Sequence, residues 1–229
     1  LIKNGINYIR NNDYKEAKII FKKSIELSPA LPNGYLNLSN IYLIEKKLNQ
    51  AQELLFEYIS NNGLNIEIAN HLGKICLQYK QYDNLQKLLS MFNLKGNKTN
   101  FDYHILFFFE GRCYEEDLKI NNAINSYKNS IKCNKDFEPS YTNLLNLLEK
   151  INDFKNLQKF IDLGLYSSRI KKKITFIYYK SFLFNRLNKF SESEKTIKEN
   201  NLEHEFANNN FFNQRLLDLI AKNNEKLKN

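Results

Sequence analysis

The 229-residue sequence predicts an all-α fold of repeated helix pairs, and three observations indicate it. The chain holds only 7 Gly and 3 Pro, residues that the many turns of an all-β fold need. Apolar residues return at three- and four-residue steps, which is typical of one face of a helix. The segment Asp13-Tyr14-Lys15-Glu16-Ala17 also has counterparts at nearly constant intervals, which indicates a stack of similar units.

Two series of positions define this repeat and keep the same register over six units. One series consists mostly of small residues in what we expect to be the first helix of each unit: Gly5, Ser39, Gly73, Gly111, Leu145 and Ser181. The other series lies in the expected second helix of each unit, just after the turn between the two helices, and its members are separated by nearly equal numbers of residues: Ala17, Ala51, Leu85, Ala123, Leu157 and Ser193. Such a constant register predicts one structural role for each series.

Each unit is expected to contain two amphipathic helices joined by a short turn. In the second unit, Tyr35, Leu38 and Ile41 mark the apolar face of the first helix, and Leu55 and Tyr58 mark that of the second. The predicted units span about 1–31, 32–65, 66–103, 104–137, 138–173 and 174–205, with an extra helix over about 209–226. We expect all of them to form a single solenoid domain over 1–229.

The small positions and the turns have separate physical reasons. A small residue such as Gly5, Ser39 or Gly73 fits where two helices cross closely, and the alanine position of the second helix lies opposite it. The Asx-rich stretch between the helices supplies turn and N-cap residues. Pro29 follows the second helix of the first unit and cannot continue it.

These positions resemble the tetratricopeptide repeat, a helix-turn-helix unit with a period of about 34 residues. The resemblance covers about residues 1 to 200, and Leu145, Leu157 and Ser193 depart from its small-residue pattern. It implies a right-handed α-α superhelix (solenoid) of about six repeats plus a C-terminal helix. The first helices of such an array line a concave face.

Two residues of each first helix are expected to project into that concave groove, judged by their offset from the small position. Asn can bond a peptide main chain as donor and acceptor, and Lys or Arg adds charge-assisted bonds to a carboxylate. The candidate ligand groove comprises Asn37, Asn40, His71, Lys74, Phe109, Arg112, Asn143, Asn146, Tyr179 and Phe182. The alternative is that these are ordinary exposed positions in a chain rich in Asn and Lys.

The carboxylate clamp of the chaperone-binding members of this family is not expected here. That clamp uses Lys, Asn, Asn, Lys and Arg across three repeats. The matching places hold Ile2, Ile6, Asn37, Glu67 and His71, of which Asn37 alone fits. A chaperone adaptor is therefore not the function that the sequence predicts.

No catalytic, cofactor-binding or metal-binding motif is found, so we expect no cofactor and no enzymatic activity in this chain. The three His residues lie far apart, and no phosphate-binding or nucleophile motif occurs. Three Cys without CxxC spacing suggest a reducing compartment, hence a cytoplasmic location. The net charge of +9 suggests RNA binding as a possible function, but acidic residues near the groove argue against a nucleic-acid partner. No apolar run is long enough for a membrane span.

The sequence therefore predicts a non-catalytic scaffold that binds a peptide or protein segment in its concave groove. The alternative is an accessory array of a larger bacterial enzyme, a sulfotransferase or glycosyltransferase, whose catalytic domain is absent from this chain. The stretch "IYYKSFLFNRLNKFSESEKTI" loosely resembles repeats that precede bacterial sulfotransferase domains. Neither end carries a polar capping repeat, so we expect a piece of a longer chain.

Overall fold

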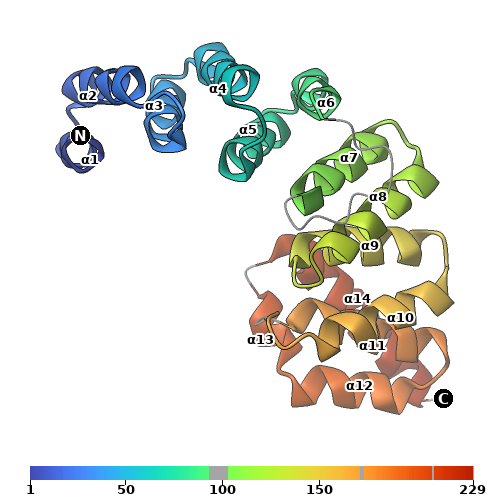
Figure 1. Ribbon diagram of the computed structural model, residues 1–229. Helices are drawn as coiled ribbons and strands as arrows, with labels where there is room; N and C mark the ends of the chain where they lie inside the picture. The colour runs from blue at the N-terminus through green and yellow to red at the C-terminus, as the bar shows by residue number, and fades with distance from the viewer. Residues whose placement is uncertain (93–102, 171–172, 208, 229) are drawn as a thin grey trace. The chain divides into compact units, whose positions relative to one another are not determined.

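The computed structural model describes residues 1–92, 103–170, 173–207 and 209–228, and within these ranges every regular element is a helix (Figure 1). The helices are α1 (Ile2–Arg10), α2 (Tyr14–Leu27), α3 (Pro32–Ile44), α4 (Leu48–Asn62), α5 (Ile66–Gln78), α6 (Tyr82–Ser90), α7 (His104–Glu116), α8 (Ile120–Cys133), α9 (Glu138–Lys150), α10 (Phe154–Tyr166), α11 (Ile174–Arg186), α12 (Phe190–Glu199), α13 (Leu202–Phe206) and α14 (Asn210–Lys228). The predicted all-α fold is confirmed.

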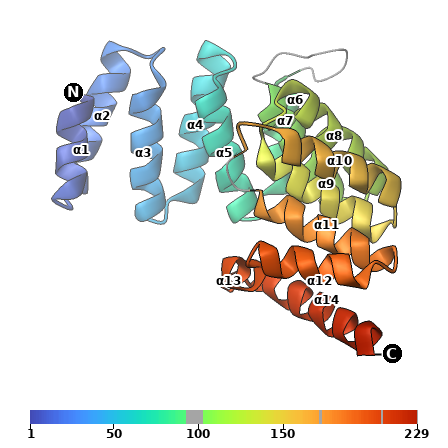
Figure 2. The same ribbon diagram turned by 90° about the horizontal axis from the view of Figure 1, so that it is seen from below.

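The chain divides into two compact units. Unit 1 comprises Leu1–Lys98 and Ile105–Cys113, and unit 2 comprises Thr99–His104 and Tyr114–Asn229. In unit 1, α3, α4 and α5 lie side by side in chain order, and in unit 2 α10, α11 and α12 do so (Figure 2). The alternation of first and second helices agrees with the predicted helix-turn-helix units. The single solenoid domain over 1–229 stays a prediction.

The turn between the two helices of each repeat has the same backbone geometry in all six repeats. The Lys47 N–H donates to the Tyr42 carbonyl at 2.7 Å, and the Lys46 N–H donates to the Leu43 carbonyl at 3.0 Å. This bond pair is a Schellman motif, which requires a left-handed residue just after the helix. The left-handed residues, with φ from 54° to 60°, are Asn12, Lys46, Lys80, Leu118, Asn152 and Asn188. The repeat found in the sequence is therefore a repeat of backbone conformation.

The expected N-caps are present at two of these turns. The Asp13 carboxylate accepts a bond from the Glu16 N–H at 3.1 Å, and Asp153 accepts one from the Asn156 N–H at 3.1 Å. Both bonds satisfy a backbone donor that the first helical turn leaves free. The equivalent residues without a side-chain cap bond are Lys47, Gln81, Lys119 and Lys189.

The small residues of the first helices make room for aromatic rings, which corrects the predicted reason for their size. A Cβ atom at Gly73 would lie 2.1 Å from the ring of Phe109 in α7. A Cβ atom at Gly5 would lie 2.5 Å from the ring of Phe21 in α2. These positions are thus small because a neighbouring side chain fills the space, rather than because two bare backbones meet.

Candidate ligand-binding surface

Two polar residues occupy matching positions on neighbouring first helices of unit 1. Asn40 on α3 and Lys74 on α5 are one repeat apart, and both side chains are exposed. The two helices are in contact, and the Ser39 hydroxyl and the His71 Nε2 atom lie 3.0 Å apart between them. We name Asn37, Asn40, His71 and Lys74 the α3/α5 row. It offers both an amide and an ammonium group to a ligand.

His71 is held as a neutral imidazole within this row. Burial, and to a smaller extent the charge of Lys74, lower the pKa of His71 below its ordinary value. The Ser39 hydroxyl has one hydrogen, which it donates to the Leu36 carbonyl at 2.8 Å. His71 must therefore donate its Nε2–H to Ser39. The Nδ1 atom of the neutral ring is then left as an acceptor.

The other two polar candidates of unit 1 are half-buried. Asn37 lies on α3, where its Nδ2 donates to the Asn33 carbonyl at 2.7 Å and thus fixes the orientation of the amide. Arg112 lies on α7 and retains part of its surface. Asn37 therefore presents an oriented amide oxygen, and Arg112 keeps part of its side chain within reach of solvent.

Phe109 does not line a groove, contrary to the prediction. Its side chain is 0% exposed, and its ring fills the space above Gly73. The absence of a side chain at Gly73 lets the ring pack inward. The prediction that Phe109 is exposed used only its distance in sequence from the small residue of its own helix, and took no account of the neighbouring helix α5.

In unit 2, the extra helix α14 supplies a side chain that contacts the predicted groove residues. The Arg215 guanidinium donates to the Asn146 Oδ1 at 3.3 Å and to the Tyr179 hydroxyl at 3.5 Å. It also forms an ion pair with Glu149 and lies 5.5 Å from the centroid of the Tyr178 ring. Burial lowers the pKa of Arg215, and the ion pair with Glu149 favours its charged form. Arg215 thus occupies the bonding groups that were expected to hold a ligand.

Tyr179 and Phe182 are also buried, at 0% and 7% exposure, which corrects their assignment to a ligand groove. The Phe212 ring of α14 packs edge-to-face on Tyr179, with centroids 6.1 Å apart. Asn143 is half-buried and its Nδ2 donates to the Tyr127 hydroxyl at 3.3 Å. The structure therefore does not bring the ten predicted residues together as one open row.

Arg215 is the residue of this region that sequence reasoning missed. The sequence predicted a helix over about 209–226, and α14 confirms it. Arg215 contacts Asn146 and Tyr179, which precede it by two repeats and one repeat. No small-residue position anchors the register of α14 against α11, so no local signal indicated which of its residues points inward.

The described residues contain no group of three or more His, Cys, Asp or Glu side chains placed to hold a metal ion. Cys76 and Cys113 are buried, Cys133 is half-buried, and none of the three forms a disulfide within the described part of the chain. Burial raises the pKa of Cys76 to about 11, so its thiolate is scarce at neutral pH. In the same part of the chain, no helix combines the length and apolarity that a membrane crossing requires.

The comparisons with known proteins agree on the fold. A family model described as "Tetratricopeptide repeat" matches residues 5–31, which contain most of α1 and all of α2. The solved structure of pilF from Pseudomonas aeruginosa superposes with a TM-score of 0.68 at 15% identity and covers 95% of both chains. The chain folds as a tetratricopeptide repeat array.

Two further solved structures resemble this tetratricopeptide repeat array. PilW, described as a type IV pilus biogenesis factor, has a TM-score of 0.56 at 17% identity, with 94% of this chain and 96% of PilW covered. The Cut9-Hcn1 hetero-tetramer of the APC/C has a TM-score of 0.59 at 16% identity, and the match covers 97% of this chain and 42% of the matched chain. At these identities the likeness shows the fold alone.

A curated relative matches part of the tetratricopeptide array in sequence. The Sol locus transcriptional repressor of Clostridium acetobutylicum is 27% identical over 93 residues, or 41% of this chain. The match covers 29% of the repressor, so the array spans less than a third of that protein. The resemblance to repeats that precede sulfotransferase domains stays a prediction.

Proposed function

We propose that the array is a non-catalytic scaffold that binds a peptide or protein segment on the α3/α5 row. The observation that carries the proposal is the pair of exposed side chains, Asn40 and Lys74, at equivalent positions of adjacent first helices. The Ser39–His71 bond links the two helices that carry them. The two helices are therefore joined before a ligand binds, which lowers the entropic cost of ordering them.

The chemistry of this row suits an extended peptide with an acidic residue. The Asn40 amide can pair with a peptide N–H and C=O at once, and Lys74 can bind a carboxylate. Among solved structures of similar fold, the Cut9-Hcn1 hetero-tetramer is an assembly of protein partners. That assembly supports a protein partner for this chain as well.

The test is a selection of peptides from a random displayed library, followed by affinity measurements on the intact chain. We expect Lys74→Glu and Asn40→Ala each to weaken selected peptides about tenfold, which corresponds to ~1.4 kcal/mol. Lys23→Glu on α2 is the matched control, since Lys23 is also exposed but lies on a second helix. If both row variants bind all selected peptides like the wild type, the proposal fails.

The accessory array of a larger sulfotransferase or glycosyltransferase remains the alternative. It rests on sequence resemblance, and no contact among the described residues favours it over the scaffold. Sequencing the gene outward from both ends would decide between the two, because a phosphate-binding strand-loop-helix in the same frame would identify a catalytic domain.

A further inference from the structure

A second charged surface lies on two second helices of unit 2, far in sequence from the α3/α5 row. On α8, Lys128 and Lys132 are one helical turn apart, and on α10, Lys155 and Lys159 are likewise. Like charges at this spacing destabilise an isolated helix slightly. Helix stability therefore gives no reason for either pair.

The two helices bring these lysines together. The ammonium of Lys128 lies 6.0 Å from the centroid of the Phe160 ring, and that of Lys159 lies 5.8 Å from the same centroid. Phe160 is a residue of α10, so Lys128 reaches across from α8. Lys128 of α8 and Lys159 of α10 thus lie near the same ring.

The lysines of this face form no ion pairs within the described part of the chain: none of Lys128, Lys132, Lys135, Lys155 and Lys159 has an ion-pair partner there. The carboxylates on the same elements make their direct bonds to other groups, Asp136 to Ser167 and Arg169, Asp153 to Asn156, and Asp162 to Gln158.

The charges of Lys128 and Lys155 also act on Asp153. The pKa of Asp153 is lowered first by its bond from Asn156, and further by the charges of Lys128 and Lys155. An anion that approaches the face meets the same two ammonium groups. We name Lys128, Lys132, Lys135, Lys155 and Lys159 the α8/α10 face.

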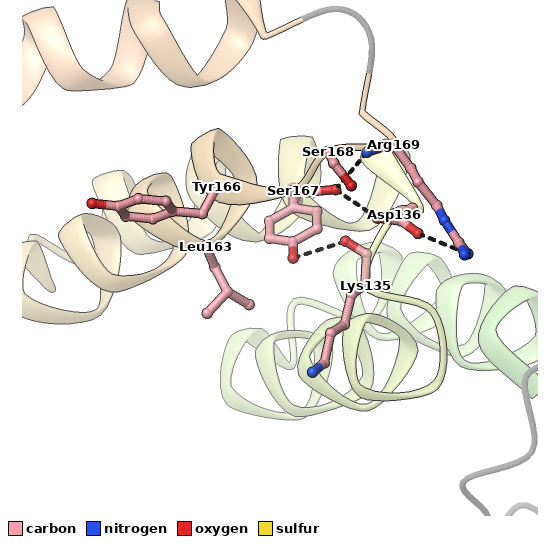
Figure 3. Close-up of a pocket in the computed structure, with 8 residues that line it drawn as sticks. Lys135, Asp136, Leu163, Tyr166, Ser167, Ser168 and Arg169 are labelled. Atoms are coloured by element: carbon pink, nitrogen blue, oxygen red, sulfur yellow. Dashed lines mark hydrogen bonds and ion pairs between the residues drawn. The ribbon is translucent and has the colours of Figure 1, made fainter.

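A pocket of about 350 Å³ opens at the end of this face, lined by the apolar or aromatic side chains of Tyr141, Leu163 and Tyr166 and by Lys135, Asp136, Ser167, Ser168 and Arg169. Figure 3 shows Leu163 and Tyr166 projecting from α10 on one wall, while Lys135 comes from the α8–α9 loop on the other. Tyr166 is 88% exposed and Leu163 is 39% exposed. Lys159, Leu163 and Tyr166 follow one another at successive turns of the helix. One face of α10 therefore carries both a lysine of the charged face and two residues that line the pocket.

The pocket is formed in advance because hydrogen bonds fix its two loops. The Ser167 hydroxyl donates to the Asp136 carboxylate at 2.5 Å, and Arg169 lies 3.7 Å from the other oxygen of that carboxylate. The Tyr141 hydroxyl donates to the Lys135 carbonyl at 3.0 Å. The bonds of Asp136 join the α8–α9 loop to the α10–α11 loop, and the Tyr141 bond ties the α8–α9 loop to α9 (Figure 3).

We propose that the α8/α10 face binds an acidic segment of a partner protein, with one apolar or aromatic side chain of that segment seated beside Leu163 and Tyr166. Charge complementarity selects the acidic segment, and the pocket selects the apolar side chain. A single-stranded nucleic acid fits less well, because Tyr166 offers one stacking platform where such ligands use several. The site shares no residue with the α3/α5 row, so a test of this proposal is independent of a test of the α3/α5 row.

The experiment measures fluorescence anisotropy of two labelled peptides with the intact chain at low and high salt. One is a short polyglutamate with a central phenylalanine, and the other has serine in its place. We expect the phenylalanine peptide to bind more tightly, with an affinity that falls as salt rises. Lys159→Glu should weaken both peptides about fivefold, since it removes one favourable charge contact and adds a repulsive one.

Tyr166→Ala separates the pocket from the charge. It should weaken the phenylalanine peptide and leave the serine peptide unchanged. Lys23→Glu carries the same charge change outside the face and should leave both affinities within about twofold, because only long-range screening remains.

Three results would overturn the proposal. Equal weakening by Lys23→Glu and Lys159→Glu would show attraction by net charge alone. Equal affinity of the two peptides would remove the pocket from the site. Tighter binding of polyuridylate than of either peptide would make the face a nucleic-acid surface.

Discussion

Leu118 is the position where a single substitution is expected to stabilise the array. It is the left-handed residue of the α7–α8 turn, with φ of 57°, where three of the equivalent turns have Asn. A left-handed conformation costs a residue with a Cβ roughly 1–2 kcal/mol, whereas glycine adopts it freely. Since Leu118 is 81% exposed, removal of its side chain sacrifices little buried area.

The expected gain follows from two opposing contributions. Relief of the left-handed conformation gives about 1–2 kcal/mol, and the greater freedom of glycine in the unfolded chain takes back about 0.5–1 kcal/mol. Leu118→Gly should therefore stabilise by about 0–1.5 kcal/mol, with a central value of roughly 0.75 kcal/mol. Leu118→Asn should give a similar or smaller gain, because Asn tolerates this conformation through local hydrogen bonds.

The assay is urea unfolding followed by circular dichroism, with thermal melting as a second measure. A gain of this size raises Tm by about 1–4 °C in a chain of this length. Leu187→Gly is the matched control, since Leu187 is also exposed but has φ of −91°. It should lose about 0.5–1 kcal/mol from glycine entropy alone. If Leu118→Gly is as destabilising as this control, the left-handed strain assigned to Leu118 does not exist.

Three further changes test the packing described above. Gly73→Ala should destabilise by roughly 1–3 kcal/mol in urea unfolding, because its Cβ would lie 2.1 Å from the Phe109 ring. His71 has a lowered pKa in the folded chain, so below about pH 6.5 the unfolded chain binds more protons than the folded chain. The free energy of unfolding should therefore fall as the pH falls toward the folded pKa. In His71→Gln, the free energy of unfolding should depend less on pH between about pH 7 and 5. Arg215→Ala should cost roughly 1–3 kcal/mol, since it leaves Glu149 half-buried without its cation.

Each of these changes has its own control. Gly5→Ala also creates a close contact, at 2.5 Å from Phe21, but lies at the end of the array where repeats fray most easily. It should cost less than Gly73→Ala, and equal losses would argue against the assigned importance of the central contact. A pH dependence that persists in His71→Gln would point to other groups. Glu149→Ala combined with Arg215→Ala should recover part of the lost stability, and no recovery would mean that the ion pair is not the cause.

The helix pairs could be predicted from the sequence because their determinants are local. Apolar spacing defines each helix, and Asp13 and Asp153 sit where an N-cap is needed. The turn at Leu118 shows the limit of residue preference, since a leucine adopts the left-handed conformation that the repeat imposes. The left-handed conformation of Leu118 could be deduced from the nearly constant spacing of the repeats, but not from the preference of leucine itself.

The candidate site could be predicted only where exposure depends on the repeat alone. Asn40 and Lys74 lie on the surface as expected, whereas Phe109 packs inward over Gly73. Tyr179 is buried, and the Phe212 ring of α14 packs edge-to-face on it. Burial at these positions is decided by contacts between helices, which the pattern of one helix does not contain.

Asn40 and Asn146 illustrate how one residue type at one repeat position acquires two roles. Asn40 keeps its amide exposed and able to bond a ligand, while the Asn146 amide oxygen accepts a bond from Arg215. A ligand that approached Asn146 would first have to displace Arg215 and leave Glu149 without its partner, at a cost of roughly 1–3 kcal/mol before any new contact formed. That is about one to two orders of magnitude in affinity. Arg215 of α14 therefore opposes ligand binding at Asn146, whereas the α8/α10 face carries lysines without ion-pair partners among the described residues and adjoins a pocket.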